Sequence, residues 1–150
     1  FEANYKKWRN GYRILIGGSG AYWTTTKQKK DVTYDGFKKY LRMVFAYSST
    51  ASLLGECIKT TLSDLKVGDV FIQSGSSRHA AMVVDICENV QGKKAFLLAQ
   101  GYTPAQQFHI LKNPAHEDSP WYFEDEISYP LKTPEYSFRK GSLMHPGYLD

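Results

Sequence analysis

The chain has 150 residues, of which 42% are hydrophobic and 23% are charged, and its formal net charge is +4. These values are ordinary for a folded protein, so they exclude a disordered chain and predict a single domain over residues 1–150. The basic residues form no long run, which excludes a nucleic-acid footprint, and no stretch reaches the roughly 18 apolar residues of a membrane-spanning helix.

The first element is a predicted β-hairpin from Gly11 to Thr26. A glycine-rich run at 17–20 supplies the turn, and the residues on both sides are β-branched or aromatic. A helix should follow, because a set of apolar residues recurs with the spacing of one helical face. This face comprises Phe37, Tyr40, Leu41, Val44 and Phe45.

Asp31 or Thr33 can cap the N-terminus of this main helix. A second, short helix is expected from Thr50 to Ile58, with Cys57 near its end.

Three strands are predicted in the middle of the chain: Val70–Ile72, His79–Ile86 and Ala95–Gln100. A Gly/Ser loop at 74–78 joins the first two, and a turn at 88–93 joins the last two. The strand that begins at His79 is almost wholly apolar, so we expect it to be central and buried on both faces. Beyond Tyr102 the pattern loosens, with a further short strand expected around 108–111. Together these elements predict an α+β fold.

His79 and Gln100 are the leading candidates for chemistry. A histidine at the start of a strand lies at the rim of the sheet, half solvated, where it can act as a base near neutral pH. If the turn is centred near Gly92, antiparallel pairing brings Gln100 close to His79. The glutamine could then accept a ring N–H and orient the imidazole.

The segment from Leu65 to Asp85 resembles the histidine-bearing hairpin of NlpC-type and CHAP-type papain-like cysteine amidopeptidases. In those families a Gly-Asp turn, here Gly68-Asp69, opens a strand, and the catalytic histidine begins the next strand. The resemblance implies a papain-like (NlpC-type) antiparallel β-sheet packed against one main helix and short helices. It also implies that His79 is the general base and Gln100 its orienting partner.

The same families place a catalytic cysteine at the start of the helix that precedes this hairpin. Tyr34 stands at that position here, and tyrosine, with an ordinary pKa near 10, is a poor acyl-transfer nucleophile. Cys87 shares a strand with His79 but lies eight residues away, about 26 Å along the chain. Cys57, or a hydroxyl of Thr33 or Ser49, remains as an alternative nucleophile. The two cysteines could also form one disulfide.

A second resemblance covers nearly the whole chain. The sequence is similar to a family of bacterial proteins, mainly from Bacteroidetes, that is defined only as a domain of unknown function. The matching segments are Tyr5–Arg13, Val44–Leu53, Gly68–Ile72 with His79–Ala80, Leu97–Gln106, and Leu111–Pro114 with Ser119–Tyr122. By implication the chain is the C-terminal portion of a longer protein that is secreted, periplasmic or part of the cell envelope.

Two functions are therefore expected. The first is a non-catalytic domain that binds a peptidoglycan-like peptide or glycan in a groove between the main helix and the His79 strand. Tyr34, Tyr102 and Trp121 would form the aromatic walls of this groove. The second is an amidase or peptidase that uses His79 as base with a cysteine or hydroxyl nucleophile.

No cofactor or metal is predicted. His109 and His116 are the only other pair of histidines close in the sequence, and no third ligand joins them at the spacing of a metal site.

Overall fold

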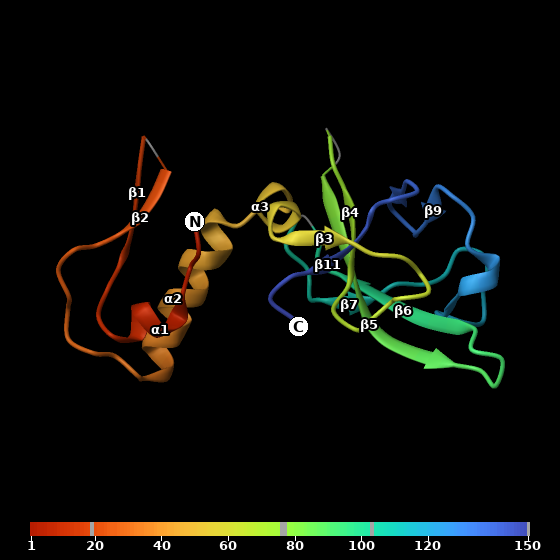
Figure 1. Ribbon diagram of the computed structural model, residues 1–150, viewed down its shortest axis with the longest axis horizontal. Helices are drawn as coiled ribbons and strands as arrows, with labels where there is room; N and C mark the ends of the chain where they lie inside the picture. The colour runs from red at the N-terminus through yellow and green to blue at the C-terminus, as the bar shows by residue number, and fades with distance from the viewer. Residues whose placement is uncertain (19, 76–77, 103, 150) are drawn as a thin grey trace. The chain divides into compact units, whose positions relative to one another are not determined.

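A computed structural model describes residues 1–18, 20–75, 78–102 and 104–149. The chain divides into two compact units, Phe1–Ser48 and Ser49–Asp150 (Figure 1). The expected turn at Ser19 and part of the expected loop, Ser76–Ser77, lie outside the described residues. The expectation of one domain over residues 1–150 stays a prediction, and each unit is described here by itself.

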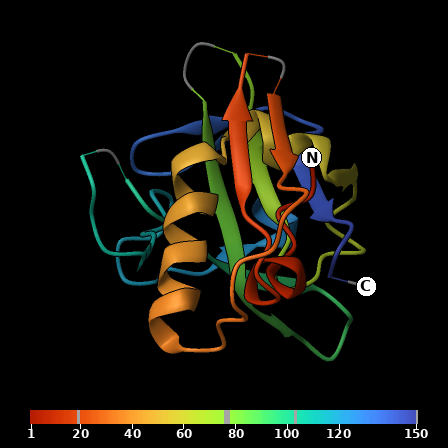
Figure 2. The same ribbon diagram turned by 90° about the vertical axis from the view of Figure 1, so that its left-hand side faces the viewer.

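The first unit contains the predicted hairpin. Its strands β1 (Ile14–Gly17) and β2 (Gly20–Trp23) pair in antiparallel fashion, as expected. The helix α1 (Tyr5–Arg9) precedes them, and the main helix α2 (Tyr34–Tyr47) follows them (Figure 2).

Aromatic packing joins the two helices of this unit. The indole of Trp8 in α1 is buried and donates a hydrogen bond to the carbonyl of Gly36, and its ring meets Tyr40 edge to face. Thr33 caps α2, because its hydroxyl accepts a hydrogen bond from the Gly36 amide at 3.1 Å. The predicted apolar face is half-buried except at Phe45, which is exposed.

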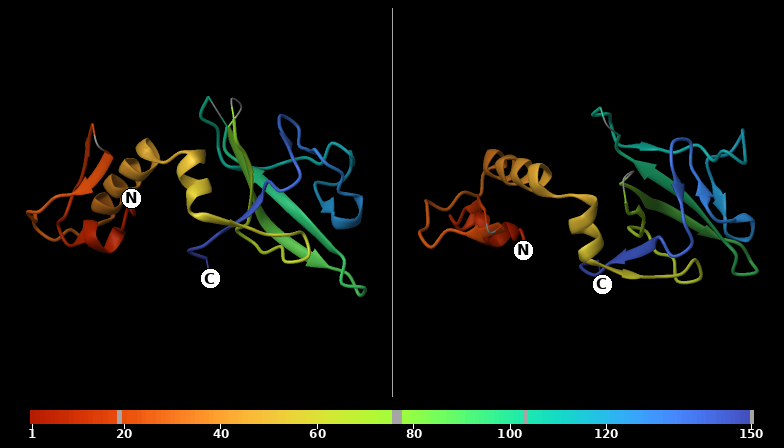
Figure 3. Two further views of the ribbon diagram at one scale, coloured as in Figure 1. Left: turned by 45° about the horizontal axis from the view of Figure 1, so that its top comes forward. Right: turned by 90° about the horizontal axis from the view of Figure 1, so that it is seen from above.

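The second unit is built on one antiparallel sheet. Its hydrogen-bonded order is β3-β11-β4-β5-β6-β7, and β8 also pairs with β6. The central strands are β4 (Val70–Gln73), β5 (His79–Glu88) and β6 (Lys94–Gln100), so the three strands predicted in the middle of the chain are all present. β5 and β6 run side by side as the longest pair (Figure 3).

The remaining elements of this unit are short. β11 (Leu143–Pro146) lies between β3 (Cys57–Lys59) and β4, while β7 (His109–Ile110) and β8 (Tyr122–Phe123) both pair with β6. A 3-10 turn at Glu124–Glu126 follows β8. β9 (Leu131–Lys132) and β10 (Ser137–Phe138) form a separate hairpin.

The second predicted helix is shorter than expected. α3 spans Thr50–Gly55, and the chain then turns into β3, so the prediction that Cys57 lies in a helix was wrong. Cys57 and Ile58 instead pair with β11, near the end of the chain. Pairing with a distant strand overrides the local helical preference of such a short segment, and it leaves no local signal in the sequence.

The main core lies on one face of the sheet, under the C-terminal segment. It joins side chains of β4, β5 and β6 to residues that follow β7, and its members are Leu65, Phe71, Ala81, Val83, Phe96, Leu98, Leu111, Tyr122, Leu131, Phe138 and Leu143. Burial of this much apolar surface is what stabilises the unit. We call this face of the sheet the core face.

The opposite face carries a smaller cluster of Val70, Ile72 and Met144, against which Leu53 of α3 packs. We call this the α3 face. Within β5, Ala81 and Val83 are buried on the core face, while Met82 between them is exposed. The strand is therefore central, as predicted, but it is not buried on both faces.

The α+β class predicted from the sequence is confirmed, with mostly antiparallel strands and few helices. Among the described residues, no helix has both the length and the apolar character needed to span a bilayer.

Candidate functional site

His79 is the first residue of β5, and it pairs with Gln73 at the end of β4. The strand turns its side chain to the core face, in line with Ala81 and Val83, because side chains alternate along a strand. The imidazole is half-buried at the rim of the sheet. This is the position that the sequence predicts for it.

Gln100 contacts this imidazole directly. Nε2 of His79 lies 2.6 Å from Oε1 of Gln100, and the side-chain amide of Gln100 donates to a carboxylate oxygen of Glu135 at 3.0 Å. A carboxylate only accepts hydrogen bonds, so the amide nitrogen of Gln100 must face Glu135 and its oxygen must face His79. It follows that His79 carries a proton on Nε2 and donates it to Gln100.

The sequence predicts that Gln100 comes close to His79, but it does not predict the register in which β5 and β6 pair. Met82 pairs with Ala99, and continuing this register by one residue sets Gln100 opposite Ala81, two residues from His79. A bulge between Val83 and Asp85 causes this shift relative to simple pairing across the β5–β6 turn.

Tyr136 covers the imidazole. Its ring stacks on His79 with the centroids 3.7 Å apart and the planes 2° from parallel. Tyr102 stands edge-on to His79, with a centroid distance of 6.5 Å, and also meets Tyr136. We call His79, Gln100, Tyr102, Glu135 and Tyr136 the His79 cluster.

Of the two ring nitrogens of His79, Nδ1 has no hydrogen-bond partner in the described part of the chain. In a neutral imidazole that is protonated on Nε2, Nδ1 is an acceptor. It can therefore receive a hydrogen bond from a ligand or, in a reacting site, a proton.

Cys57 does not reach this imidazole. β11 and β4 lie between β3 and β5 in the sheet, which separates the two backbones by about 14 Å. The thiol also packs on the α3 face, whereas the His79 cluster lies on the core face. Partial burial, together with the negative charges of Glu56 and Asp69, raises the pKa of the Cys57 thiol. Such a thiol is largely protonated at neutral pH and is a weak nucleophile.

The comparison with known protein families gives one match. A model of DUF4846, a domain of unknown function, matches residues 1–145. The chain belongs to this family. The match spans both compact units, and it confirms that the chain falls in a domain-of-unknown-function family, as the whole-chain resemblance implied. No curated protein and no solved structure matches the chain.

The DUF4846 chain holds a second histidine pair at the other end of β4. Nδ1 of His145 lies 2.5 Å from Oδ1 of Asp69, and both side chains are buried. The other carboxylate oxygen of Asp69 accepts the backbone amide of Lys66, as expected for the residue after Gly68 in a turn. The sequence gives no sign of this pair, because the partner of His145 lies 76 positions earlier in the chain.

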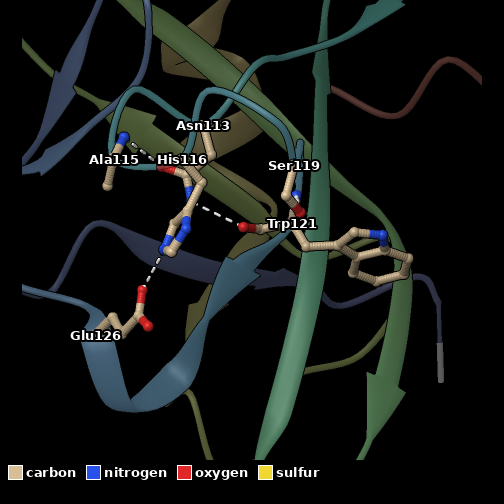
Figure 4. Close-up of polar contacts among 6 residues, drawn as sticks. All are labelled: Asn113, Ala115, His116, Ser119, Trp121 and Glu126. Atoms are coloured by element: carbon tan, nitrogen blue, oxygen red, sulfur yellow. Dashed lines mark hydrogen bonds and ion pairs between the residues drawn. The ribbon is translucent and has the colours of Figure 1, made fainter.

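Trp121, one of the predicted aromatic walls, lies away from the His79 cluster. Trp121 precedes β8, which pairs with β6 at Ala95 and Phe96, far along the strand from Gln100. Its indole points away from the neighbouring pair of His116 and Glu126 (Figure 4), whose side chains are 2.5 Å apart. Tyr34 belongs to the first unit, so the predicted groove between α2 and the His79 strand stays a prediction.

Glu135 and Tyr136 also belong to the site, and neither could be predicted from the sequence. Both lie in the turn between β9 and β10, where the Tyr136 amide donates to the hydroxyl of Thr133. The short hairpin is held by the core through Leu131 and Phe138. A Pro-rich segment with no periodicity gives no signal that it folds back onto His79.

Both cysteines are free, with Cys57 half-buried and Cys87 exposed. Within the described ranges of the DUF4846 chain, no group of three or more His, Cys, Asp or Glu residues could hold a metal ion.

Proposed function

We propose that the chain is a non-catalytic binding domain of the bacterial cell envelope that takes a peptide or glycan of the cell wall at the His79 cluster. The observation that carries the proposal is the parallel stack of His79 on Tyr136. This stack, together with the hydrogen bond to Gln100, fixes the imidazole in one orientation. A fixed imidazole with aromatic neighbours is a recognition surface, and Cys57 lies in β3, which β11 and β4 separate from the His79 strand.

The chemistry of the cluster suits a ligand rich in N–H and O–H groups. Nδ1 of His79 is an acceptor, and the exposed carboxylate of Glu135 accepts as well. Tyr102 and Tyr136 are half-buried, so part of each ring is open to solvent. Aromatic rings of this kind supply apolar contact area together with a polar tip, which suits peptides and the apolar faces of sugars.

A distant relationship to the NlpC-type papain-like fold is part of this proposal. Its support is the arrangement of a histidine that opens one strand and a polar partner on the next antiparallel strand. With Tyr34 at the expected place of the nucleophile, the chain would keep the scaffold and use it for binding.

The alternative function is an amidase or peptidase with His79 as general base. The observation that favours it is the unpaired Nδ1, which is the acceptor that a nucleophile would need. In this alternative a hydroxyl of the same unit, such as that of Ser49, would take the place of the missing cysteine.

The binding proposal is tested by titrating the 150-residue chain with purified muropeptides and with short glycan strands, followed by calorimetry. We expect binding that weakens about tenfold or more in Tyr136→Ala, since a stacking platform contributes roughly 1–3 kcal/mol to a contact of this kind. Tyr148→Ala removes an exposed tyrosine near the other end of the sheet and is the matched control.

Equal loss of binding in Tyr136→Ala and Tyr148→Ala would place the ligand elsewhere. The absence of binding to every muropeptide and glycan strand would refute the proposal.

A further inference from the structure

The two compact units differ in charge. Residues 1–48 contain ten Lys or Arg and three Asp or Glu, a formal net charge of +7, whereas residues 49–150 contain nine and twelve, a formal net charge of −3. The basic side chains of the first unit are spread over α1, the loop that follows β2, and α2. A unit with this excess of positive charge attracts anionic partners, and the attraction is screened by salt.

The helix α2 has a basic side. Its 14 residues include three cations, Lys38, Lys39 and Arg42, and one acid, Asp35, which pairs with Lys38 at 2.8 Å. Lys39 and Arg42 are exposed, and neither has an ion-pair partner among the described residues. The helix therefore presents a net positive charge to the solvent.

Aromatic side chains lie next to these cations on the same helix. Tyr34 and Phe45 are eleven residues apart, about three helical turns, so they lie on one side of α2. They are 73% and 72% exposed, although another side of the helix packs on α1 through Phe37 and Tyr40. Lys38 lies between them, with its Nζ 4.8 Å from the ring centroid of Tyr34. Two large aromatic side chains are thus left in water on a helix whose packed side is already covered.

The hairpin of the same unit exposes further apolar side chains. Leu15 and Tyr22 are cross-strand partners, and both are exposed, as is Ile16 near the end of β1. Because side chains alternate along a strand, Leu15 points to the opposite face from Ile14, which is buried. The positively charged unit therefore combines an excess of cations with uncovered apolar side chains on two of its elements.

These two properties together identify the partner. A soluble polyanion would neutralise the cations but would leave Tyr34, Phe45 and Leu15 in water. A bilayer with anionic lipids meets both needs, because its headgroups attract Lys and Arg while its acyl boundary buries apolar side chains. With 14 residues, α2 is too short to span a bilayer but is long enough to lie on one.

We propose that the first unit docks on the surface of a bilayer that contains anionic lipids. In this arrangement α2 lies along the surface, with Tyr34 and Phe45 at the acyl boundary. Lys38 and Arg42 extend their charged ends to the headgroups, as long basic side chains do at such a boundary. The proposal is independent of the function of the His79 cluster, which belongs to the second unit.

The test is co-sedimentation of the 150-residue chain with vesicles of two compositions: phosphatidylcholine alone, and phosphatidylcholine with about one-third phosphatidylglycerol. We expect the anionic vesicles to bind at least about tenfold more tightly, because several cations contribute together near an anionic surface. Binding should weaken as the salt concentration is raised, since part of the attraction is electrostatic. Heparin, a soluble polyanion without an apolar phase, is the third probe.

Two variants test the two parts of the contact. Phe45→Ser should weaken binding to anionic vesicles about tenfold, because the exposed ring no longer enters the acyl boundary, and should leave any binding of heparin unchanged. Arg42→Gln should weaken vesicle binding about fivefold. Both residues are exposed, so the thermal midpoint of the free protein should stay close to that of the wild type. Val90→Ser and Lys93→Gln, in the exposed β5–β6 turn, are the matched controls and should leave vesicle binding unchanged.

Three results would overturn the proposal. The first is the absence of binding to anionic vesicles, and the second is equal binding to both vesicle compositions. The third is vesicle binding that Phe45→Ser leaves unchanged, which together with tight heparin binding would identify a soluble polyanion as the partner.

Discussion

The two ends of β4 each hold a histidine on the core face of the sheet, but in different surroundings. At one end, His145 is buried against the buried carboxylate of Asp69. At the other end, His79 is half-buried, hydrogen-bonded to Gln100 and stacked on Tyr136. Both pairs join residues that are far apart in the sequence.

The difference between these two sites is access. The Asp69–His145 pair is closed off and ties β4 to β11, so its role is to hold the sheet together. The rings of the His79 cluster are half-buried, and Nδ1 of His79 has no hydrogen-bond partner among the described residues. A polar cluster that is ordered and yet accessible is the kind of site that proteins use for ligands. Substitutions at the two ends should therefore separate stability from binding.

The largest expected effect is a loss of stability at the Asp69–His145 pair. Asp69→Ala removes the acceptor of both His145 and the Lys66 amide from a buried site, so we expect a loss of about 3 kcal/mol in the free energy of unfolding. Urea denaturation followed by circular dichroism measures it. Asp118→Asn, at an exposed position, is the control and should change stability by less than about 0.5 kcal/mol. A loss in Asp69→Ala no larger than in the control would contradict a structural role for the pair.

A smaller loss of stability is expected at Gln100, the buried residue of the His79 cluster. Gln100→Leu removes the hydrogen-bond partner of both His79 and Glu135 and replaces the amide with an apolar side chain of similar size. We expect a cost of about 2 kcal/mol in the same denaturation experiment. The ¹⁵N shifts of the His79 ring should also change, because its Nε2–H would lose its acceptor. Unchanged ring shifts would mean that the contact between Gln100 and His79 does not exist in solution.

Tyr136→Ala should cost less stability still, about 1 kcal/mol, because the stack is at the rim of the core. Tyr136→Phe keeps the ring, and within the described residues its hydroxyl makes no hydrogen bond, so this variant should behave like the wild type. The pair of variants is compared by thermal unfolding. If Tyr136→Phe destabilised as much as Tyr136→Ala, the hydroxyl and not the ring would be the important group.

The smallest effect concerns Cys57 and leaves stability untouched. Its raised pKa keeps the thiol protonated at neutral pH, so its thiolate fraction grows only as the pH rises past the ordinary cysteine range. We expect iodoacetamide to modify Cys57 in a Cys87→Ser variant at least about fivefold more slowly at pH 8 than Cys87 in a Cys57→Ser variant. Fast alkylation of Cys57 below pH 7 would contradict this and would reopen its role as a nucleophile.

The parts of the fold that follow from local sequence could be predicted. The apolar runs and the glycine-containing turn around β5 and β6 identify the central hairpin, and the position of His79 at a strand start follows from it. The helix α2 follows from its apolar spacing and its Thr33 cap.

The parts that depend on distant pairing could not be predicted. β3 exists because Cys57–Lys59 pairs with β11, and the hairpin that carries Tyr136 reaches His79 because Phe138 is held in the core. The partner of His145 is likewise set by the sheet order. Residues close to these positions in the sequence carry no signal for these long-range contacts. Only part of the site could therefore be predicted from the sequence.

The central claim is that the His79 cluster binds and does not cleave. Its most direct test is mass spectrometry of purified muropeptides after long incubation with the wild-type chain and with His79→Ala. The account predicts that every muropeptide keeps its mass with both proteins. New fragments that appear with the wild type and are lost in His79→Ala would contradict it, because they would show that Nδ1 of His79 acts as a catalytic base.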